Sequence, residues 1–214
     1  MELILYLFAA VCGYLAAGFN PAIAMSKAIY GRDIRECGSG NPGFTNFKRT
    51  FGGRYAWFVL LLDLSKAAVA VGFFSYLFGY FGMDRQLGAA FTGCFAMLGH
   101  AYPAFYGFKG GKGFLVCLST AWVIDLRVGL IATLLMIALL LLTHYMSLST
   151  VLAMWSCPFT ISLLGGSVEA IILCAAAVLF MTWRHKENFK RLLRGTESRF
   201  DLFDKKKKEE LAKK

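Results

Sequence analysis

Seven apolar blocks, separated by short segments rich in charged residues or glycine, are the feature of this chain that most restricts its fold. Hydrophobic residues make up 57% of its 214 residues, more than the roughly one half that is usual in soluble domains. A helix needs about 20 apolar residues to cross a bilayer, with a lower limit near 17, so several blocks are short. The pattern predicts an all-α fold, a polytopic membrane helix bundle of about seven transmembrane helices, with five or six as alternatives. The blocks cover residues 3–19, 55–80, 87–102, 114–124, 128–143, 150–165 and 168–183.

The first block begins at the start of the chain and follows Glu2 rather than a basic region. A cleaved signal peptide starts with positive charge, so we expect a first transmembrane helix here. No long polar linker divides the blocks, which favours one integral membrane domain over residues 1–197. We expect residues 198–214 to form a disordered, basic cytoplasmic tail. Attraction to anionic lipid is favoured over nucleic-acid binding for its charge run, and a solvated tail without function fits as well.

Lysine and arginine orient the predicted helices. Seven helices put the termini on opposite sides, and we place the C-terminus in the cytoplasm and the N-terminus outside. The inner segments are then 20–54, 103–113, 144–149 and 184–214, and they carry 20 of the 23 Lys and Arg residues. This excess is what the positive-inside rule requires, and it persists when the tail is left out.

The segment Gly99–Gly113, between the third and fourth blocks, holds five glycines, two lysines and one histidine. Glycines let backbone N–H groups approach a ligand closely, and lysines add positive charge. The segment therefore predicts an anion site, for a phosphate, where the chain leaves the membrane. It is not a Walker A loop, because its GxxxGK run is one residue short and lacks the Ser or Thr. His100 has two interpretations, and a hydrogen-bonded residue at a helix end is favoured over a catalytic base.

A second polar segment, residues 38–52, lies in the first inner loop. Its hydroxyl and amide side chains supply hydrogen-bond donors, and Arg49 can bind a phosphate through two parallel hydrogen bonds. The run Gly-Asn-Pro-Gly is also strong turn chemistry, so a turn and a ligand loop are equally consistent with this segment alone.

A third polar segment, residues 183–197, follows the last block and contains His185, Asn188 and Arg191. On its own it is typical of a short amphipathic helix at the membrane surface. However, the predicted topology brings all three segments to one membrane face. Lys66, three residues after Asp63 in the second block, is an ionisable group of the kind that usually faces the interior of a membrane bundle. Together these features predict a site for an anionic substrate at the membrane surface.

The three segments resemble the motifs of the bacterial membrane glycerol-3-phosphate acyltransferases that use acyl phosphate as the acyl donor. The resemblance rests on residues 39–52, 99–113 and 184–197, with Asp63, Lys66 and a short signature at residues 145–149. It runs from the first block to about Glu197 and leaves out the lysine-rich end. The chain departs from the usual pattern at Ala67, Phe114 and Phe189, none of which is a charged motif position.

The resemblance implies transfer of a fatty acyl group from acyl phosphate to the 1-hydroxyl of sn-glycerol 3-phosphate, the first acylation step of phospholipid synthesis. The products are lysophosphatidic acid and phosphate. It implies a multi-pass protein of the bacterial inner membrane whose active site faces the cytoplasm, with membrane lipid as a partner and without a cofactor, a metal or nucleic acid. The candidate catalytic residues are His185, Asn188 and Ser147. The candidate phosphate-binding residues are Ser39, Asn41, Thr45, Asn46, Arg49, Lys66, His100, Lys109, Gly110, Gly111, Lys112, Gly113 and Arg191.

We hypothesise that the two lysines of the second motif and its glycine amides, those of Gly110, Gly111 and Gly113, hold one phosphate. Ser39, Asn46 and Arg49 would hold the other, and His185 and Asn188 would orient the attacking hydroxyl. Positioning and charge stabilisation can supply most of the acceleration, because a mixed anhydride has a good leaving group.

The base is either His185 or a phosphate of the substrate. The chain lacks the His-x4-Asp pair of CoA-dependent glycerolipid acyltransferases. The competing function is a membrane transporter for a phosphorylated solute, but the chain shows no evident internal repeat.

Overall fold

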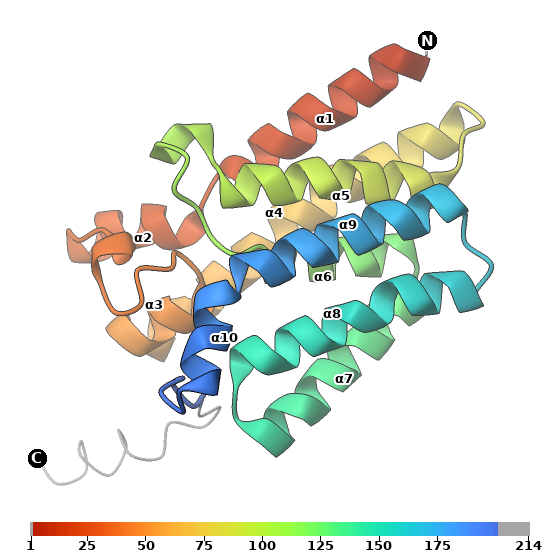
Figure 1. Ribbon diagram of the computed structural model, residues 1–214. Helices are drawn as coiled ribbons and strands as arrows, with labels where there is room; N and C mark the ends of the chain where they lie inside the picture. Colours follow the sequence, from red (N-terminus) through yellow and green to blue (C-terminus); the bar gives the residue numbers. More distant parts are fainter. Residues whose placement is uncertain (1, 201–214) are drawn as a thin grey trace, which may run out of the picture.

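The computed structural model describes residues 2–200 and consists of helices, with no strand in that range. Seven of the helices coincide with the seven predicted blocks, and they lie beside one another as a bundle (Figure 1). Their coincidence with the blocks confirms the predicted all-α bundle. These helices are α1 (Glu2–Gly18), α4 (Gly53–Tyr80), α5 (Arg85–Ala101), α6 (Phe114–Ile124), α7 (Leu126–Thr143), α8 (Met146–Leu163) and α9 (Val168–Arg184).

Helix length separates these seven helices into two groups. Four segments in residues 2–200 are long and apolar enough to cross a membrane: Glu2–Tyr30, α4, α7 and α8. A fifth is added if α9 and the helix that follows it, bent by 54°, are one span. Helix α6 has 11 residues and is therefore about 16 Å long, roughly half of the hydrocarbon thickness. These long apolar helices support a multi-pass membrane protein, and the count of seven spans remains a prediction.

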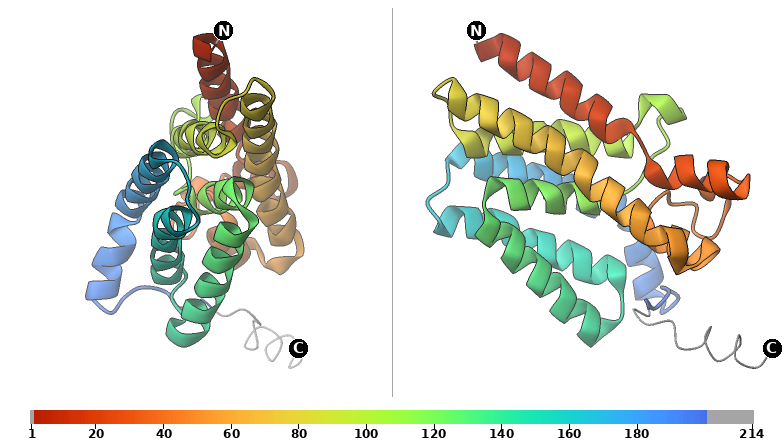
Figure 2. Two further views of the ribbon diagram at one scale, coloured as in Figure 1. Left: turned by 90° about the vertical axis from the view of Figure 1, so that its right-hand side faces the viewer. Right: turned by 180° about the vertical axis from the view of Figure 1, so that it is seen from behind.

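Five short helical elements gather at one end of the bundle, together with the loop 102–113 (Figures 1 and 2). They are α2 (Pro21–Tyr30), α3 (Phe44–Phe51), α10 (Lys186–Leu193) and the single turns Ile34–Glu36 and Ala104–Tyr106. Helix α10 is the short helix expected after the last block. Helix α3 differs from the expected turn or loop, because the polar run 44–51 forms two helical turns whose apolar side packs Phe47 into the core.

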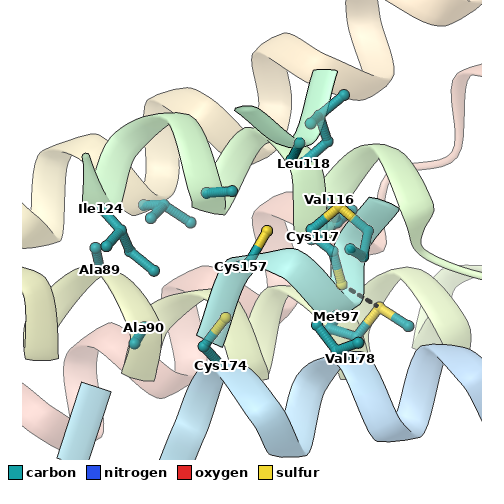
Figure 3. Packing of buried hydrophobic residues seen from close by; sticks show 14 of the residues in the cluster. Ala89, Ala90, Met97, Val116, Cys117, Leu118, Ile124, Cys157, Cys174 and Val178 are labelled. Atoms are coloured by element: carbon teal, nitrogen blue, oxygen red, sulfur yellow. Dashed lines mark hydrogen bonds between the residues drawn. The ribbon is translucent and has the colours of Figure 1, made fainter. Parts of the chain in front are cut away.

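Small side chains dominate the packing between the central helices. The largest core cluster contains eight buried alanines, which come from α1, α4, α5, α6, α7 and α9. Figure 3 shows Ala89 and Ala90 facing Ile124 and the sulfur atoms of Cys157 and Cys174 nearby. Small residues let helix backbones approach closely, which is how membrane helices associate where burial of apolar surface from water contributes little.

The outer surface of the bundle is apolar, with Leu163 87% and Leu142 79% exposed. A soluble monomer rarely shows such a large apolar surface, whereas lipid tails cover it in a membrane protein. Near the end of the described chain, Phe200 is buried, and its N–H donates to the His144 carbonyl oxygen at 2.8 Å. The packed chain thus extends to Phe200, and the rest of the predicted tail, residues 201–214, lies outside the described residues.

Helices α1 and α5 pack so closely at Gly99 that a Cβ atom there would lie 2.0 Å from the Tyr14 carbonyl oxygen. We therefore expect Gly99→Ala to force the two helices apart and to lower the free energy of unfolding by about 1–3 kcal/mol. Gly72→Ala in α4 is the matched control, because a Cβ atom there would meet no atom within 4 Å and alanine favours a helix by up to about 1 kcal/mol. Thermal unfolding in detergent measures both variants, and equal melting temperatures would contradict the close packing.

Candidate functional site

The Glu197 carboxylate is the centre of a polar network at the end of the bundle where the short helices gather. Its Oε1 accepts hydrogen bonds from Ser147 Oγ at 2.9 Å and from Asn188 Nδ2 at 2.7 Å, and its Oε2 pairs with Arg191 Nε at 2.8 Å. The three donors come from α8 and α10. Burial raises the pKa of Glu197, but hydrogen bonds from these donors outweigh it and hold the pKa below its ordinary value. The carboxylate is therefore charged and joins parts of the chain 50 residues apart.

Lys112 is the cation at the centre of this site. Its Nζ donates to Asn188 Oδ1, so that Asn188 joins Lys112 to Glu197 with both ends of its amide. The pKa of Lys112 is lowered to about 8, and burial is the largest cause. The charges of Arg191, Arg184 and Arg49 contribute to this lowering, whereas Glu197 opposes it. The charges of three arginines and one carboxylate thus act on Lys112, and this excess of positive charge favours a bound anion.

Helix α6 begins two residues after Lys112, at Phe114. Its N-cap is Gly113, which provides no side-chain hydrogen bond to the first turn. The first N–H groups of a helix have no partner within it and carry partial positive charge, which makes such an end attractive to anions. Lys112 and the start of α6 therefore present charge and free N–H groups from the same place.

Two of the three glycine amides predicted to bind phosphate, those of Gly110 and Gly111, already have hydrogen-bond partners within the protein. Gly110 N–H donates to the Ala101 carbonyl oxygen and Gly111 N–H to that of His100, both at 3.1 Å. These two amides are satisfied within the loop and are not available to a phosphate, which corrects the predicted role of Gly110 and Gly111. Gly111 is instead needed for space, because a Cβ atom there would lie 2.2 Å from His100 Nε2. Lys109 is exposed at the surface of the loop.

Lys66 and His100 form a buried pair behind the second motif. Lys66 Nζ lies 3.1 Å from His100 Nδ1, 2.8 Å from Asp63 Oδ1 and 2.5 Å from the Phe19 carbonyl oxygen. Three acceptors thus already engage the Lys66 ammonium group. These contacts hold the motif loop against α4 and the residue after α1, and phosphate binding by Lys66 and His100 remains a prediction.

The first motif is held in shape by Asn46. Its Oδ1 accepts from Ser39 N–H at 2.9 Å, and its Nδ2 donates to the carbonyl oxygens of Cys37 and Ile34 at 2.9 and 3.4 Å. Asn46 therefore fixes the loop, and its amide has no donor left for a phosphate. The Ser39 side chain and Arg49 are exposed, and Asn41 and Thr45 are half-buried, so these four can still face a ligand.

His185 lies between α9 and α10 and is buried. Its Nδ1 donates to the Met181 carbonyl oxygen at 2.8 Å, which orients the ring and leaves Nε2 as the acceptor of a neutral imidazole. Of the three candidate catalytic residues, His185 is therefore the one whose free nitrogen can meet a hydroxyl. Ser147 and Asn188 are already committed to Glu197.

Arg35, Arg184 and Glu197 lie at this end of the bundle, and none of them has a role predicted from the sequence. Arg35 Nη1 donates to the Tyr106 carbonyl oxygen at 2.7 Å and so ties the first inner loop to the second motif. Arg184 Nη2 donates to the carbonyl oxygens of Gly110 and Gly111 at 3.2 and 3.0 Å, and its buried Nε has no acceptor within residues 2–200. Charge alone cannot tell these residues from other basic or acidic loop residues. The contacts that bring them to the site lie 74 residues away for Arg35 and Arg184 and six to 50 residues away for Glu197.

The described part of the chain contains no group of three or more His, Cys, Asp or Glu side chains that could hold a metal ion. The lysine, the arginines, the free helix N–H groups and the neutral imidazole of this site can bind anions, orient a hydroxyl and stabilise negative charge.

Comparison with known proteins supports the resemblance drawn from the motifs. The sequence profile of the family described as glycerol-3-phosphate acyltransferase matches residues 7–195. A glycerol-3-phosphate acyltransferase of Aquifex aeolicus is 35% identical over 200 residues, which cover 92% of this chain and 98% of that protein. One of Agrobacterium fabrum is 37% identical over 191 residues, covering 89% and 90%.

Two solved structures of an integral membrane glycerol 3-phosphate acyltransferase are similar to this chain in fold and sequence. The chain is similar to PlsY (YgiH), an integral membrane glycerol 3-phosphate acyltransferase, in its glycerol 3-phosphate form, with a TM-score of 0.84 and 33% identity over 92% of this chain and 96% of that one. For the lysophosphatidic acid form the TM-score is 0.80 and the identity 31%, over 92% and 95%. This chain belongs to the glycerol-3-phosphate acyltransferase family.

Proposed function

We propose that this protein transfers a fatty acyl group from an acyl phosphate to the 1-hydroxyl of sn-glycerol 3-phosphate. The products are lysophosphatidic acid and inorganic phosphate, and the reaction is the first acylation of phospholipid synthesis. The observation that carries the proposal is the half-buried Lys112 at the end of an apolar bundle, on which the charges of Arg191, Arg184 and Arg49 act against the single carboxylate of Glu197. Both substrates carry a phosphate, and the donor also carries an apolar chain that suits a membrane protein.

The cations divide into two groups that can serve two phosphates. Lys112, the free N–H groups at the start of α6 and the unpartnered Nε of Arg184 lie along the second motif and the end of α9. Arg49, with the hydroxyl groups of Ser39 and Thr45, belongs to the first motif. An arginine can hold a phosphate through two parallel hydrogen bonds, whereas lysine acts as a point charge.

The reaction proceeds by attack of the hydroxyl oxygen on the acyl carbon. The new ester C–O bond forms, the bond from the acyl carbon to the phosphoryl oxygen breaks, and the electron pair leaves with inorganic phosphate. The proton of the hydroxyl goes to a phosphate oxygen. Cations and helix N–H groups stabilise the negative charge that develops on the carbonyl oxygen and on the leaving phosphate.

His185 orients the hydroxyl through its Nε2 rather than storing the proton. Burial, with the charges of Lys112 and Arg184, lowers the pKa of His185 to about 4, so that the ring is neutral near pH 7. A neutral imidazole can accept a hydrogen bond from the hydroxyl and hold it in line with the acyl carbon.

We also infer the topology. The chain crosses the membrane seven times, with the short helix α6 and the loop 102–113 that leads into it together making one crossing, the N-terminus lies outside and the site faces the cytoplasm of a bacterial cell at its inner membrane. The distribution of Lys and Arg supports this orientation, because the site end of the bundle carries the basic loops. We propose membrane lipid as the surrounding partner, without a cofactor and without nucleic acid.

A reconstitution assay tests the function. Purified protein is incubated with palmitoyl phosphate and glycerol 3-phosphate, and the phosphate and lysophosphatidic acid released are measured. We expect both products in equal amounts and none without glycerol 3-phosphate beyond spontaneous hydrolysis. Absence of both products, together with uptake of glycerol 3-phosphate into vesicles, would instead support a transporter.

The role of His185 is tested by two substitutions. Glutamine keeps a hydrogen-bond acceptor and cannot serve as an efficient base, so we expect His185→Gln to retain kcat within about tenfold, whereas His185→Ala loses about a hundredfold through misplacement of the hydroxyl. Steady-state kinetics with both substrates measures the two variants. If glutamine proves as damaging as alanine in a protein that still binds glycerol 3-phosphate, the imidazole is the base.

The lowered pKa of Lys112 predicts that kcat/KM falls at alkaline pH. Below pH 8 the ammonium group is charged and holds a phosphate, and as the pH rises through about 8 the charge is lost and kcat/KM falls. Arginine stays charged at these pH values, so Lys112→Arg should move the fall upward, even if its activity is lower at neutral pH. Rates are corrected for hydrolysis of the donor without enzyme, and an unchanged alkaline limb in the variant would assign it to another group.

A further inference from the structure

Phe200 connects two parts of the site that lie far apart in the chain. Its side chain is buried, with Lys48 Nζ 4.9 Å from the centre of its ring and the centre of the Phe44 ring 6.3 Å away. Its N–H donates to the carbonyl oxygen of His144, in the turn between α7 and α8 that leads to Ser147. A single residue thus contacts both α3, the helix of the first motif, and the turn before α8.

The side of α3 that Phe200 contacts adjoins the side that carries candidate phosphate ligands. Phe44 and Lys48 are four residues apart and therefore lie in one row along the helix. Thr45 and Arg49 each follow by one residue and form a neighbouring row, about 100° around the helix. A contact that fixes the first row therefore also fixes the direction in which Thr45 and Arg49 point.

The inner side of α3 is held by the N-terminal part of the chain. Tyr30 of α2 stacks on Phe51 with ring centroids 4.2 Å apart, and Trp57 of α4 lies 5.3 Å from Phe44 by the same measure. The third motif belongs instead to the end of α9 and to α10. In the left view of Figure 2 the chain that follows α10 runs across this end of the bundle. This stretch brings Phe200 from the third motif to α3.

The link between Phe200 and the third motif is short. Glu197, which binds Ser147, Asn188 and Arg191, comes three residues before Phe200. Three residues of fully extended chain span about 10 Å at most. A helix α3 that keeps its contact with Phe200 therefore cannot move far from the Glu197 network.

We propose that Phe200 is a positioning residue that sets the distance between the two phosphate-binding groups of the site. The inference rests on the proposed function, in which Arg49 serves one phosphate and Lys112 the other, and adds the contact that keeps them apart by a fixed distance. The hydroxyl oxygen and the acyl carbon must approach to about 3–3.5 Å, so the spacing of the groups that hold the two substrates matters for the reaction. Phe200 itself acts through α3.

Phe200→Ala removes the ring and keeps the backbone N–H. With palmitoyl phosphate and glycerol 3-phosphate as substrates, we expect the KM of one substrate to rise about fivefold or more and that of the other to stay within about twofold. Arg49→Lys identifies the affected substrate, because lysine keeps the charge but cannot bind a phosphate through two parallel hydrogen bonds. The same KM should rise in both variants.

Phe200→Tyr is the conservative variant. It keeps an aromatic ring beside Lys48, so both KM values should stay within about twofold of the wild type. Leu193→Ala is the matched control, because Leu193 is an apolar residue of α10 that is 89% exposed, and neither KM should change. If Phe200→Ala fails to fold, Phe200→Leu keeps the apolar volume without the ring and should raise the same KM.

Hydrogen exchange in detergent tests the contact without the reaction. The amides of α3 should exchange faster in Phe200→Ala than in the wild type, because the helix loses support on its outer side. The amides of α5 should exchange at the wild-type rate, which separates a local effect on α3 from general destabilisation.

The outcomes separate the inference from the proposed function. If the folded Phe200→Ala variant keeps both wild-type KM values, even with a lower kcat, Phe200 does not position α3 and the inference is wrong. Wild-type exchange in α3 would contradict it equally. If the wild-type protein forms no lysophosphatidic acid from palmitoyl phosphate, the proposed function itself fails, and exchange in α3 still shows whether Phe200 holds this helix.

Discussion

The site depends on the negative charge of one half-buried carboxylate. The Glu197 carboxylate binds Ser147, Asn188 and Arg191 and, through the Asn188 amide, fixes the position of Lys112. Without it, several cations would repel one another where the chain must hold them together. Hydrogen bonds to a charged group in a partly dry environment are stronger than those between neutral groups, so one carboxylate can order several donors. The remaining positive charge is what a phosphate can neutralise.

Backbone contacts give the rest of the site its rigidity. Arg184 and Arg35 both end on carbonyl oxygens of the second motif rather than on carboxylates of distant helices. Asn46 does the same within the first motif. Loops rich in glycine lose much conformational freedom when they are ordered, and these side chains hold them in one shape before a ligand arrives.

The apolar blocks located the seven helices of the bundle because hydrophobicity is a local property of the sequence. The block 114–124 even has the bounds of α6. The short helix α3 was less apparent, since its polar, glycine-flanked sequence is equally typical of a turn. The three motifs could be placed at one end from the loop charges alone. Sequence could not tell which groups of a motif remain free, since the partners of Gly110, Asn46 and Glu197 are decided by how the loops fold onto one another.

The short helix α6 has a consequence for the chemistry of an anhydride. Asp125 alone joins it to α7, which has 18 residues and is about 27 Å long, whereas α6 covers about 16 Å. Helix α6 is therefore about 10 Å shorter than α7. Lys112, two residues before α6, is half-buried among protein groups rather than in bulk solvent. Water is the nucleophile that competes with glycerol 3-phosphate for an activated acyl group, and a recessed phosphate site keeps it scarce where the acyl carbon reacts.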